Sequence, residues 1–253
     1  MDLGLNGRRV IITGGGSGIG CAIADRLAAE GADVALCGRS REKLDRATAR
    51  ISRHGTTVLG DTVDLAEPDE LRAWVDRSAE ALGGLDIVVH NASGGGGVGE
   101  EVWQRNFTVD LLGFVRVVEQ AQKYLEQSTA ASVVALASTA AIEAFANPAA
   151  PFGALKAALI HQVAGLAHNL AAQGIRFNAV SPGPVFFDGG DWDRVQRERP
   201  AVYDRVLAAI PRGTMGTPDE VANVVTFLAS PAASLVTGVN LVADGGMTKK
   251  IKF

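Results

Sequence analysis

Short apolar segments that favour extended structure alternate with longer segments of helical periodicity along the whole chain. The expected strands are residues 10–13, 34–37, 57–60, 85–90, 133–136, 175–180 and 239–242. The expected helices begin with one near residue 18 and continue with residues 41–53, 67–82, 101–126, 150–172 and 218–229. Because such alternation places helical crossovers between parallel strands, the sequence predicts an α/β fold, a single-domain Rossmann-type doubly wound parallel sheet of about seven strands.

The length of the chain fits one domain of this kind. Its 253 residues, 47% of them hydrophobic, suffice for a core built mostly of Ala, Val, Leu and Ile. No linker or internal repeat divides the sequence, but residues 185–211 interrupt the alternation. We therefore expect residues 1–253 to form one domain, with an insertion at about residues 185–211 that covers a site.

Charge and composition exclude several classes of partner. A net charge of -4 and dispersed charged residues give no basic face, so we expect no nucleic-acid and no membrane partner. No apolar run approaches the ~20 residues of a membrane span, and a cytoplasmic location is expected. Cys21 and Cys37 are predicted to be reduced core thiols, and four scattered histidines predict no essential metal.

A glycine-rich turn follows the first expected strand. Its glycines are spaced Gly14-x-x-x-Gly18-x-Gly20, which differs from the G-x-G-x-x-G fingerprint. A turn without side chains lets the backbone approach a pyrophosphate, and the free N–H groups of the next helix attract the anion. The turn therefore predicts a dinucleotide site, with a merely flexible glycine loop as the alternative.

Residues directly after the other expected strands are the remaining candidates for a site. Ligands of doubly wound sheets bind beyond the carboxyl ends of the strands, so these residues should converge. They are Gly38 and Arg39, Asp64 and Leu65, residues 91–93, Ser138 and Thr139, and Pro182 and Gly183.

Several of these motifs, taken in order, resemble the short-chain dehydrogenase/reductase family, of the bacterial 3-oxoacyl reductase-like type, over nearly the whole chain. Thr13-Gly14 with Gly18 and Gly20 resembles the cofactor turn of the family, and Asn91-Ala92-Ser93 resembles its Asn-Ala-Gly segment. Ser138 and Lys156 resemble its active-site serine and lysine. The resemblance implies NAD(P)-dependent interconversion of alcohols and carbonyls in a catalytic domain, usually within a homotetramer. The cofactor-binding residues that it implies are Gly14, Ser17, Gly18, Ile19, Gly20, Arg39, Asp64, Leu65, Asn91, Ala92, Lys156, Pro182, Gly183 and Val185.

The end of the second expected strand bears on which cofactor is bound. An acid there accepts from the ribose 2′-OH of NAD, whereas an arginine accommodates the 2′-phosphate of NADP. This chain has Gly38 and then Arg39, which favours NADP(H) and leaves NAD(H) possible. Ser17, where NADP-dependent relatives often carry a second basic residue, weakens the preference, and Arg39 and Arg41 have the alternative of being ordinary solvated charges.

Phe152 departs from the family pattern at the position of the catalytic tyrosine. In the family that tyrosine stands four residues before the lysine, on the same helix face, and the ammonium favours its phenolate. Ser138, Phe152, Lys156 and Asp110 are the candidate catalytic residues, but a phenylalanine cannot donate or accept a proton. Three explanations stay open: a natural member that has lost or rerouted its acid, an engineered Tyr-to-Phe form, and a cofactor-binding protein without turnover.

Three further features bear on the reaction. Asp110 stands where the family usually has an asparagine that holds a water beside the lysine, and its alternative is an ordinary mid-helix aspartate. Tyr203, in the insertion, is a weak candidate for a replacement proton donor. The aromatic residues Phe186, Phe187 and Trp192 predict an apolar pocket for a small carbonyl or alcohol substrate, or else pack the insertion onto the domain.

Overall fold

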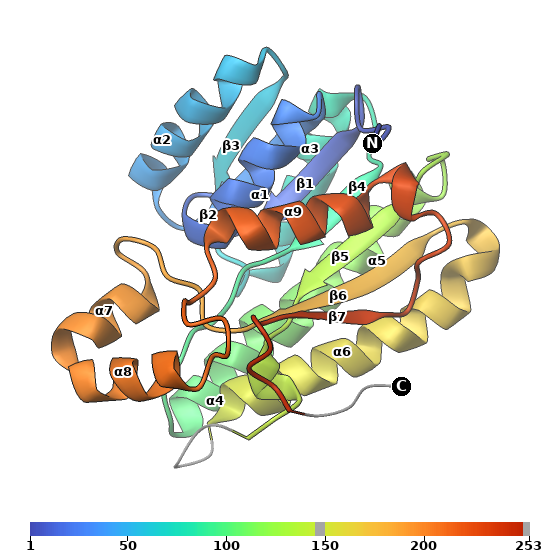
Figure 1. The fold of residues 1–253 in the computed structure, drawn as a ribbon. Helices are drawn as coiled ribbons and strands as arrows, with labels where there is room; N and C mark the ends of the chain where they lie inside the picture. Colours follow the sequence, from blue (N-terminus) through green and yellow to red (C-terminus); the bar gives the residue numbers. More distant parts are fainter. Residues whose placement is uncertain (145–149, 250–253) are drawn as a thin grey trace.

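The computed structural model describes residues 1–144 and 150–249. Within these residues, seven parallel strands form one sheet in the order β3-β2-β1-β4-β5-β6-β7 (Figure 1). The strands are β1 (Arg9–Thr13), β2 (Asp33–Gly38), β3 (Val58–Thr62), β4 (Ile87–His90), β5 (Ser132–Leu136), β6 (Arg176–Pro182) and β7 (Asn240–Ala243). The predicted doubly wound α/β fold is confirmed, because the order reverses direction between β1 and β4 and opens a crevice there.

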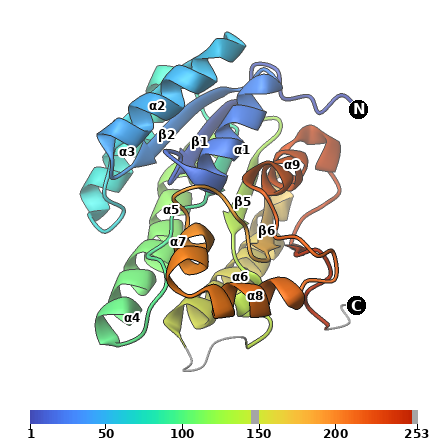
Figure 2. The same ribbon diagram turned by 60° about the vertical axis from the view of Figure 1, so that its left-hand side comes forward.

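Helices cover both faces of the sheet (Figures 1 and 2). On one face lie α1 (Gly18–Ala29), α2 (Arg41–Ile51) and α9 (Pro218–Ala229), which share an apolar core with the strands. On the other face, α3 (Pro68–Leu82), α5 (Gly113–Leu125) and α6 (Pro151–Leu170) pack around the buried side chains of Trp74, Phe114 and Phe177. No helix among the described residues is long and apolar enough to cross a membrane.

The segment after β4 is not the single helix expected for residues 101–126. It consists of α4 (Glu100–Asn106), a π-helical turn (Phe107–Leu112) and α5. The wider turn accommodates an extra residue and directs Asp110, which is 1% exposed, into the protein. The helical segment has the expected extent, but its π-helical turn was not predicted, because helical periodicity over this length does not reveal one additional residue.

The insertion folds into two short helices. They are α7 (Asp191–Glu198) and α8 (Pro200–Ala208), drawn in orange beside the carboxyl ends of the strands in Figure 1. Phe186, Trp192 and Tyr203 pack with a small cluster of buried side chains, Ile210, Met215 and Met247. The insertion is therefore an ordered layer with its own apolar contacts.

A buried carboxylate joins strands at the opposite, amino-terminal edge of the sheet. Asp86, 2% exposed, accepts from Arg9 Nε at 2.8 Å, from Arg9 Nη2 at 2.9 Å and from Ser128 Oγ at 2.5 Å. Burial alone would raise the pKa of Asp86, but these hydrogen bonds from Arg9 and Ser128 outweigh it and hold the pKa below its usual value. The network ties the start of β1 to the segments before β4 and β5.

We expect Asp86→Asn to lower the free energy of unfolding by about 1–3 kcal/mol at pH 7, because the charge-assisted bonds from Arg9 are lost. Since the pKa of Asp86 is depressed on folding, its contribution is complete above the unfolded pKa of about 4 and is lost as the pH falls through the folded pKa. Denaturant unfolding at pH 7 and at pH 3 measures the difference, which should shrink at the lower pH. Asp45→Asn, at an exposed ion pair with Arg41, is the control and should change little.

Candidate active site

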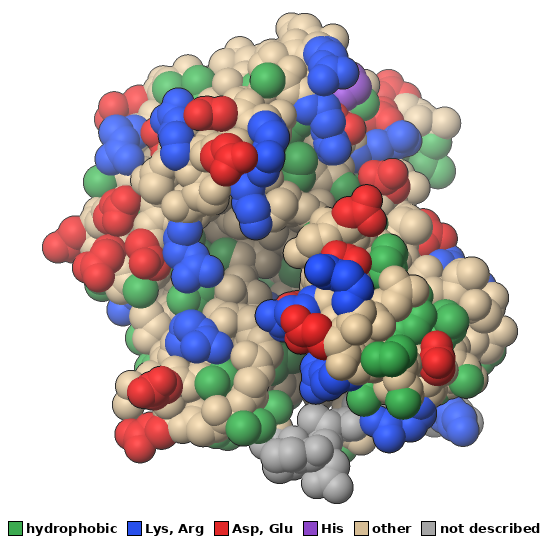
Figure 3. Space-filling model, turned by 90° about the vertical axis from the view of Figure 1, so that its left-hand side faces the viewer, with side chains coloured by type: hydrophobic (Ala, Val, Ile, Leu, Met, Phe, Trp, Pro, Cys, Tyr) green, Lys and Arg blue, Asp and Glu red, His purple; other side chains and the backbone are tan. Residues whose placement is uncertain are grey.

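A pocket of about 620 Å³ lies at the carboxyl edge of the sheet. Figure 3 shows the corresponding face of the molecule, which is hollowed near its centre and has Lys and Arg side chains around the hollow. Of the seventeen catalytic and cofactor-binding candidates named from the sequence, twelve line the pocket: Gly14, Ser17, Gly18, Ile19, Arg39, Asp64, Leu65, Asn91, Ala92, Phe152, Lys156 and Pro182. The fold therefore brings together residues that follow six different strands.

Five of these candidates do not line the pocket. Gly20 is buried against Gly14, and a Cβ at Gly20 would collide with the carbonyl oxygen of Gly14. A Cβ at Gly183 would come within 2.9 Å of Asp244, and Val185 is buried and bridges to Gly216. Asp110 and Ser138 are described below.

The glycine turn between β1 and α1 is held in a conformation that side chains disfavour. Gly14 and Gly18 have φ values of 69° and 53°. A Cβ at Gly14 would lie 2.9 Å from Asn91 Nδ2, and one at Gly18 would lie 2.5 Å from the ring of Phe187. Asn91 Nδ2 donates to the carbonyl oxygen of Gly14 at 3.0 Å and so ties the turn to the end of β4. The turn is therefore fixed by contacts within the protein, and it leads into the N-terminus of α1, where free N–H groups favour an anion.

A chain of hydrogen bonds fixes the end of β4. The backbone N–H groups of Asn91 and Ala92 both donate to Thr13 Oγ1 at 3.1 Å, which leaves the Thr13 hydroxyl to donate to His90 Nδ1 at 3.3 Å. His90 Nε2–H then donates to the backbone oxygen of Asp110 at 3.2 Å. Burial lowers the pKa of His90 to about 3, with the nearby Lys156 charge as a further cause, so the imidazole is neutral and structural.

One hydrogen bond and one ion pair hold Lys156 inside the protein. Its Nζ donates to the carbonyl oxygen of Leu136 at 2.7 Å and lies 2.9 Å from Asp110 Oδ1. The other oxygen of the same carboxylate, Asp110 Oδ2, accepts from the backbone N–H of Gly94 at 2.8 Å. Asp110 is therefore no ordinary mid-helix aspartate, since it joins the lysine to the glycine loop after β4.

The position of the expected proton donor is occupied by a ring without a polar group. Phe152 is half-buried, lines the pocket and has its ring centroid 5.8 Å from Lys156 Nζ. Ser138, also half-buried, accepts from the backbone N–H of Ala140 at 3.1 Å and caps a short 3₁₀ turn. Tyr203 does not line the pocket; its ring packs against Phe186 with centroids 6.2 Å apart. Thus the described residues place no tyrosine hydroxyl in the pocket.

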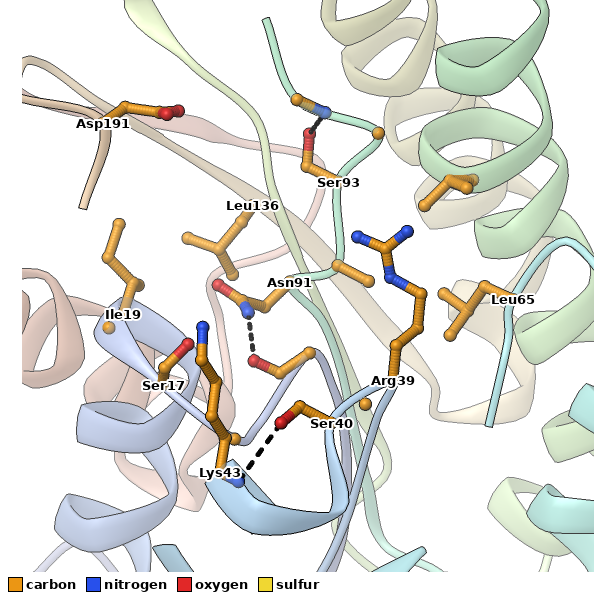
Figure 4. Close-up of a pocket in the computed structure, with 18 of the residues that line it drawn as sticks. Ser17, Ile19, Arg39, Ser40, Lys43, Leu65, Asn91, Ser93, Leu136 and Asp191 are labelled. Carbon is orange, nitrogen blue, oxygen red and sulfur yellow. Dashed lines mark hydrogen bonds between the residues drawn. The ribbon is translucent and has the colours of Figure 1, made fainter. Parts of the chain in front are cut away.

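Two cations enter the pocket from the turn between β2 and α2. Figure 4 shows Arg39 and Lys43 extending on either side of Ser40, with Lys43 directed towards Ser17. Neither side chain has a hydrogen-bond or ion-pair partner among the described residues, whereas Arg41 pairs with Asp45 at 2.8 Å and does not line the pocket. The Ser40 side chain accepts from the Lys43 backbone N–H and begins α2.

Among the charged residues that line the pocket, sequence reasoning missed Lys43, Arg105 and Asp191. The signal for Lys43 was its place three residues after Ser40, a good N-cap residue, because the first turn of a helix after a strand faces the sheet edge. Arg105 and Asp191 lie in the pocket wall with Phe187, which the sequence had put forward for an apolar pocket, and with the loop of Gly94, Gly95 and Gly96. Arg105 Nε donates to the carbonyl oxygen of Gly94 at 2.6 Å and so holds this loop in place.

Asp64 combines two interpretations that the sequence left as alternatives. Its side chain accepts from the Ala66 backbone N–H at 2.9 Å, as a turn aspartate does, and it also lines the pocket.

Among residues 1–144 and 150–249, no group of three or more His, Cys, Asp or Glu side chains is arranged to hold a metal ion. Burial raises the pKa of the Cys37 thiol well above its usual value, which makes this cysteine a poor nucleophile.

Comparisons with known proteins agree with this geometry. A family model described as Enoyl-(Acyl carrier protein) reductase matches residues 14–248. Isoepoxydon dehydrogenase patN of Penicillium expansum is 40% identical over 251 residues, which cover 98% of this chain and 97% of that protein. The chain belongs to the short-chain dehydrogenase/reductase family of oxidoreductases.

Solved structures of family members superpose closely on this one. L-sorbose reductase from Gluconobacter frateurii, complexed with NADPH and L-sorbose, has a TM-score of 0.90 and 29% identity, with 99% of this chain and 100% of that chain covered. NAD⁺-bound xylitol dehydrogenase has a TM-score of 0.89 and 27% identity, with 94% and 98% covered. The family is thus shown, whereas the bacterial 3-oxoacyl reductase-like type is not distinguished by these similarities.

Proposed function

We propose that this short-chain dehydrogenase/reductase interconverts a small carbonyl compound and its alcohol with NADP(H) as the preferred cofactor, at a site whose usual proton donor is replaced by Phe152. The observation that carries the proposal is the position of Lys156, which lines one pocket together with the glycine turn and two unpaired cations. In a nicotinamide dinucleotide the phosphates and the reacting nicotinamide ring lie far apart. The glycine turn and the two cations would bind the phosphates, and Lys156 would lie near the nicotinamide end.

The residues of the pocket fit the proposed cofactor. The turn from Gly14 to Gly18 would hold the pyrophosphate, because it lines the pocket and leads into the N-terminus of α1. Arg39 and Lys43 have no acidic partner among residues 1–144 and 150–249 and would pair with the 2′-phosphate of NADP(H). NAD(H) stays the alternative, because both cations are exposed and water can solvate them.

The chain's own residues suggest how the reaction is organised. The bound cofactor supplies or accepts a hydride, and the protein must orient the carbonyl and manage one proton. Lys156 lines the pocket as an ammonium paired with Asp110, while Ser138, which does not itself line the pocket, carries the hydroxyl proposed to orient the substrate oxygen. Phe152 shields this region from water but moves no proton, so the proton must come from solvent or substrate.

A cofactor-binding protein without turnover is the second candidate function. Phe152 favours it, because the cofactor cradle is complete whereas the proton donor is absent. Whether Phe152 is a natural or an engineered residue does not alter this contrast. Measured turnover distinguishes the two candidates.

The substrate is proposed to be apolar and small. Phe152, Phe187, Leu136 and Val109 line the pocket and give it apolar walls. The substrates named in the relatives, isoepoxydon, L-sorbose and xylitol, belong in a test panel, as do the 3-oxoacyl thioesters suggested by the sequence. A cytoplasmic location, without nucleic-acid or membrane partners, completes the proposal.

We expect NADPH to bind more tightly than NADH, and Arg39→Ala and Lys43→Ala each to weaken NADPH binding by roughly tenfold, since each removes one charge from the 2′-phosphate. NADH affinity should hardly change. Titration of protein fluorescence with each cofactor measures both constants, and Arg41→Ala is the matched control because Arg41 pairs outside the pocket. Equal losses for NADPH and NADH would contradict a 2′-phosphate role.

We expect a symmetric homotetramer in solution, because small and apolar side chains remain exposed on neighbouring helices. Ala164 and Gly165 are exposed on α6, and Trp103 and Phe107 are 47% and 45% exposed at α4 and the π-helical turn. Light scattering at micromolar concentration gives the mass. Gly165→Glu, at a position where a Cβ meets nothing within 4 Å, should reduce the mass without unfolding the subunit, whereas a monomeric parent would refute the expectation.

We expect Phe152→Tyr to raise turnover by at least about tenfold while NADPH affinity stays nearly constant, because the added hydroxyl acts on the proton transfer. Initial rates over the ketone and alcohol panel, with both cofactors, measure the effect. A parent protein that already turns over at full rate would point to a different donor. If both forms stay inert on every substrate while NADPH still binds, the cofactor-binding function is favoured.

A further inference from the structure

Lys156 carries a buried positive charge next to the ring of Phe152, which has no ionisable group. Its side chain is 3% exposed, and its Nζ lies 5.8 Å from the Phe152 ring centroid. A buried ammonium is costly unless it is paired and hydrogen-bonded. The neutral carbonyl oxygen of Leu136 satisfies one N–H, so the charge itself must be balanced by Asp110 at 2.9 Å.

The carboxylate of Asp110 is held firmly in this position. It is 1% exposed, lies on the π-helical turn and accepts from the Gly94 backbone N–H through its second oxygen. The backbone oxygen of the same residue accepts from His90 Nε2, which fixes the main chain of the turn. Rotation of the carboxylate away from Lys156 would break the bond to Gly94, so the ion pair is a fixed, nearly neutral unit.

We propose that Asp110 is a positioning residue that neutralises Lys156 and thereby removes the positive field that would favour ionisation of a hydroxyl at position 152. The roles of Phe152 and Asp110 then depend on each other. The carboxylate of Asp110 neutralises the ammonium of Lys156, and the uncharged ring of Phe152 lies on the ammonium without having to carry a compensating negative charge. Neutral asparagine at position 110 would leave the ammonium free to act on position 152. The inference rests on the proposed function only for its consequence in turnover.

The remaining charged groups near position 152 do not change between the variants compared. Those described as lining the same pocket are Arg39, Lys43, Asp64, Arg105 and Asp191. His90 lies behind Asp110 and is neutral, because burial holds its pKa at about 3. A comparison that alters only position 110 therefore isolates the effect of the Asp110 charge.

The experiment titrates a tyrosine placed at position 152, in protein without cofactor or substrate. Near-ultraviolet absorbance of tyrosinate is followed against pH for Phe152→Tyr and for Phe152→Tyr with Asp110→Asn. Matched proteins that keep Phe152 provide the signal of the chain's two own tyrosines for subtraction. We expect the new phenol of the single variant to titrate at or above the ordinary pKa of about 10, and that of the double variant to titrate at least about one unit lower.

A matched control separates a local from a general charge effect. Asp45→Asn, added to Phe152→Tyr, changes the net charge equally but at an exposed pair outside the pocket, and it should leave the phenol titration unchanged. Circular dichroism verifies that each variant is folded. If Asp110→Asn does not fold, the single variant still decides, because a phenol that titrates well below 10 would show an ammonium that is not neutralised.

The two proposals fail in distinguishable ways. Equal phenol titrations with Asp and Asn at position 110 overturn the inference about Asp110, whatever the turnover. Absence of turnover in all variants bears on the proposed function and leaves the titration readable. Where Phe152→Tyr oxidises an alcohol, the new tyrosine acts as a base, and kcat/KM falls below its apparent pKa. That apparent pKa should shift on Asp110→Asn by the same amount as the phenol titration.

Discussion

The ion pair between Lys156 and Asp110 determines how the rest of the site is arranged. An ammonium that is 3% exposed can be retained only with a fixed counter-charge, and Asp110 provides it from a turn that departs from α-helical geometry. The same carboxylate holds Gly94, and the same residue's backbone oxygen holds His90. Through these bonds the lysine of α6, the loop after β4 and the end of β1 form one connected unit.

The parallel sheet determines which residues line the pocket. Since every strand runs in the same direction, the residues that follow the strands meet at one edge, and the crevice between β1 and β4 opens there. Glycines line the pocket at that edge, and the side chains of Arg39 and Lys43 have no hydrogen-bond or ion-pair partner within the described part of the chain. These properties support a dinucleotide site, and membership of the short-chain dehydrogenase/reductase family agrees with them.

The parts of this site that were predictable share a physical basis. Strand, turn and helix periodicity placed Gly14, Arg39 and Asn91 after strands, and the fold then had to bring them together. Lys43 was missed because it lies inside a helix, where an ordinary surface lysine looks the same in the sequence. Tyr203, a weak candidate from the sequence alone, packs against Phe186 because the insertion buries its own aromatic residues.

The sequence by itself determined the alternation of strands and helices, the glycine turn and the absence of a hydroxyl at Phe152, because local propensity and residue chemistry depend on the chain alone. Only the tertiary structure decided that Asp110 faces Lys156, that Lys43 enters the pocket and that Arg41 does not. Each of these depends on the direction in which one side chain leaves its helix. A single additional residue in the π-helical turn changes that direction at Asp110 by altering the local helical register, which apolar periodicity over the whole segment does not reveal.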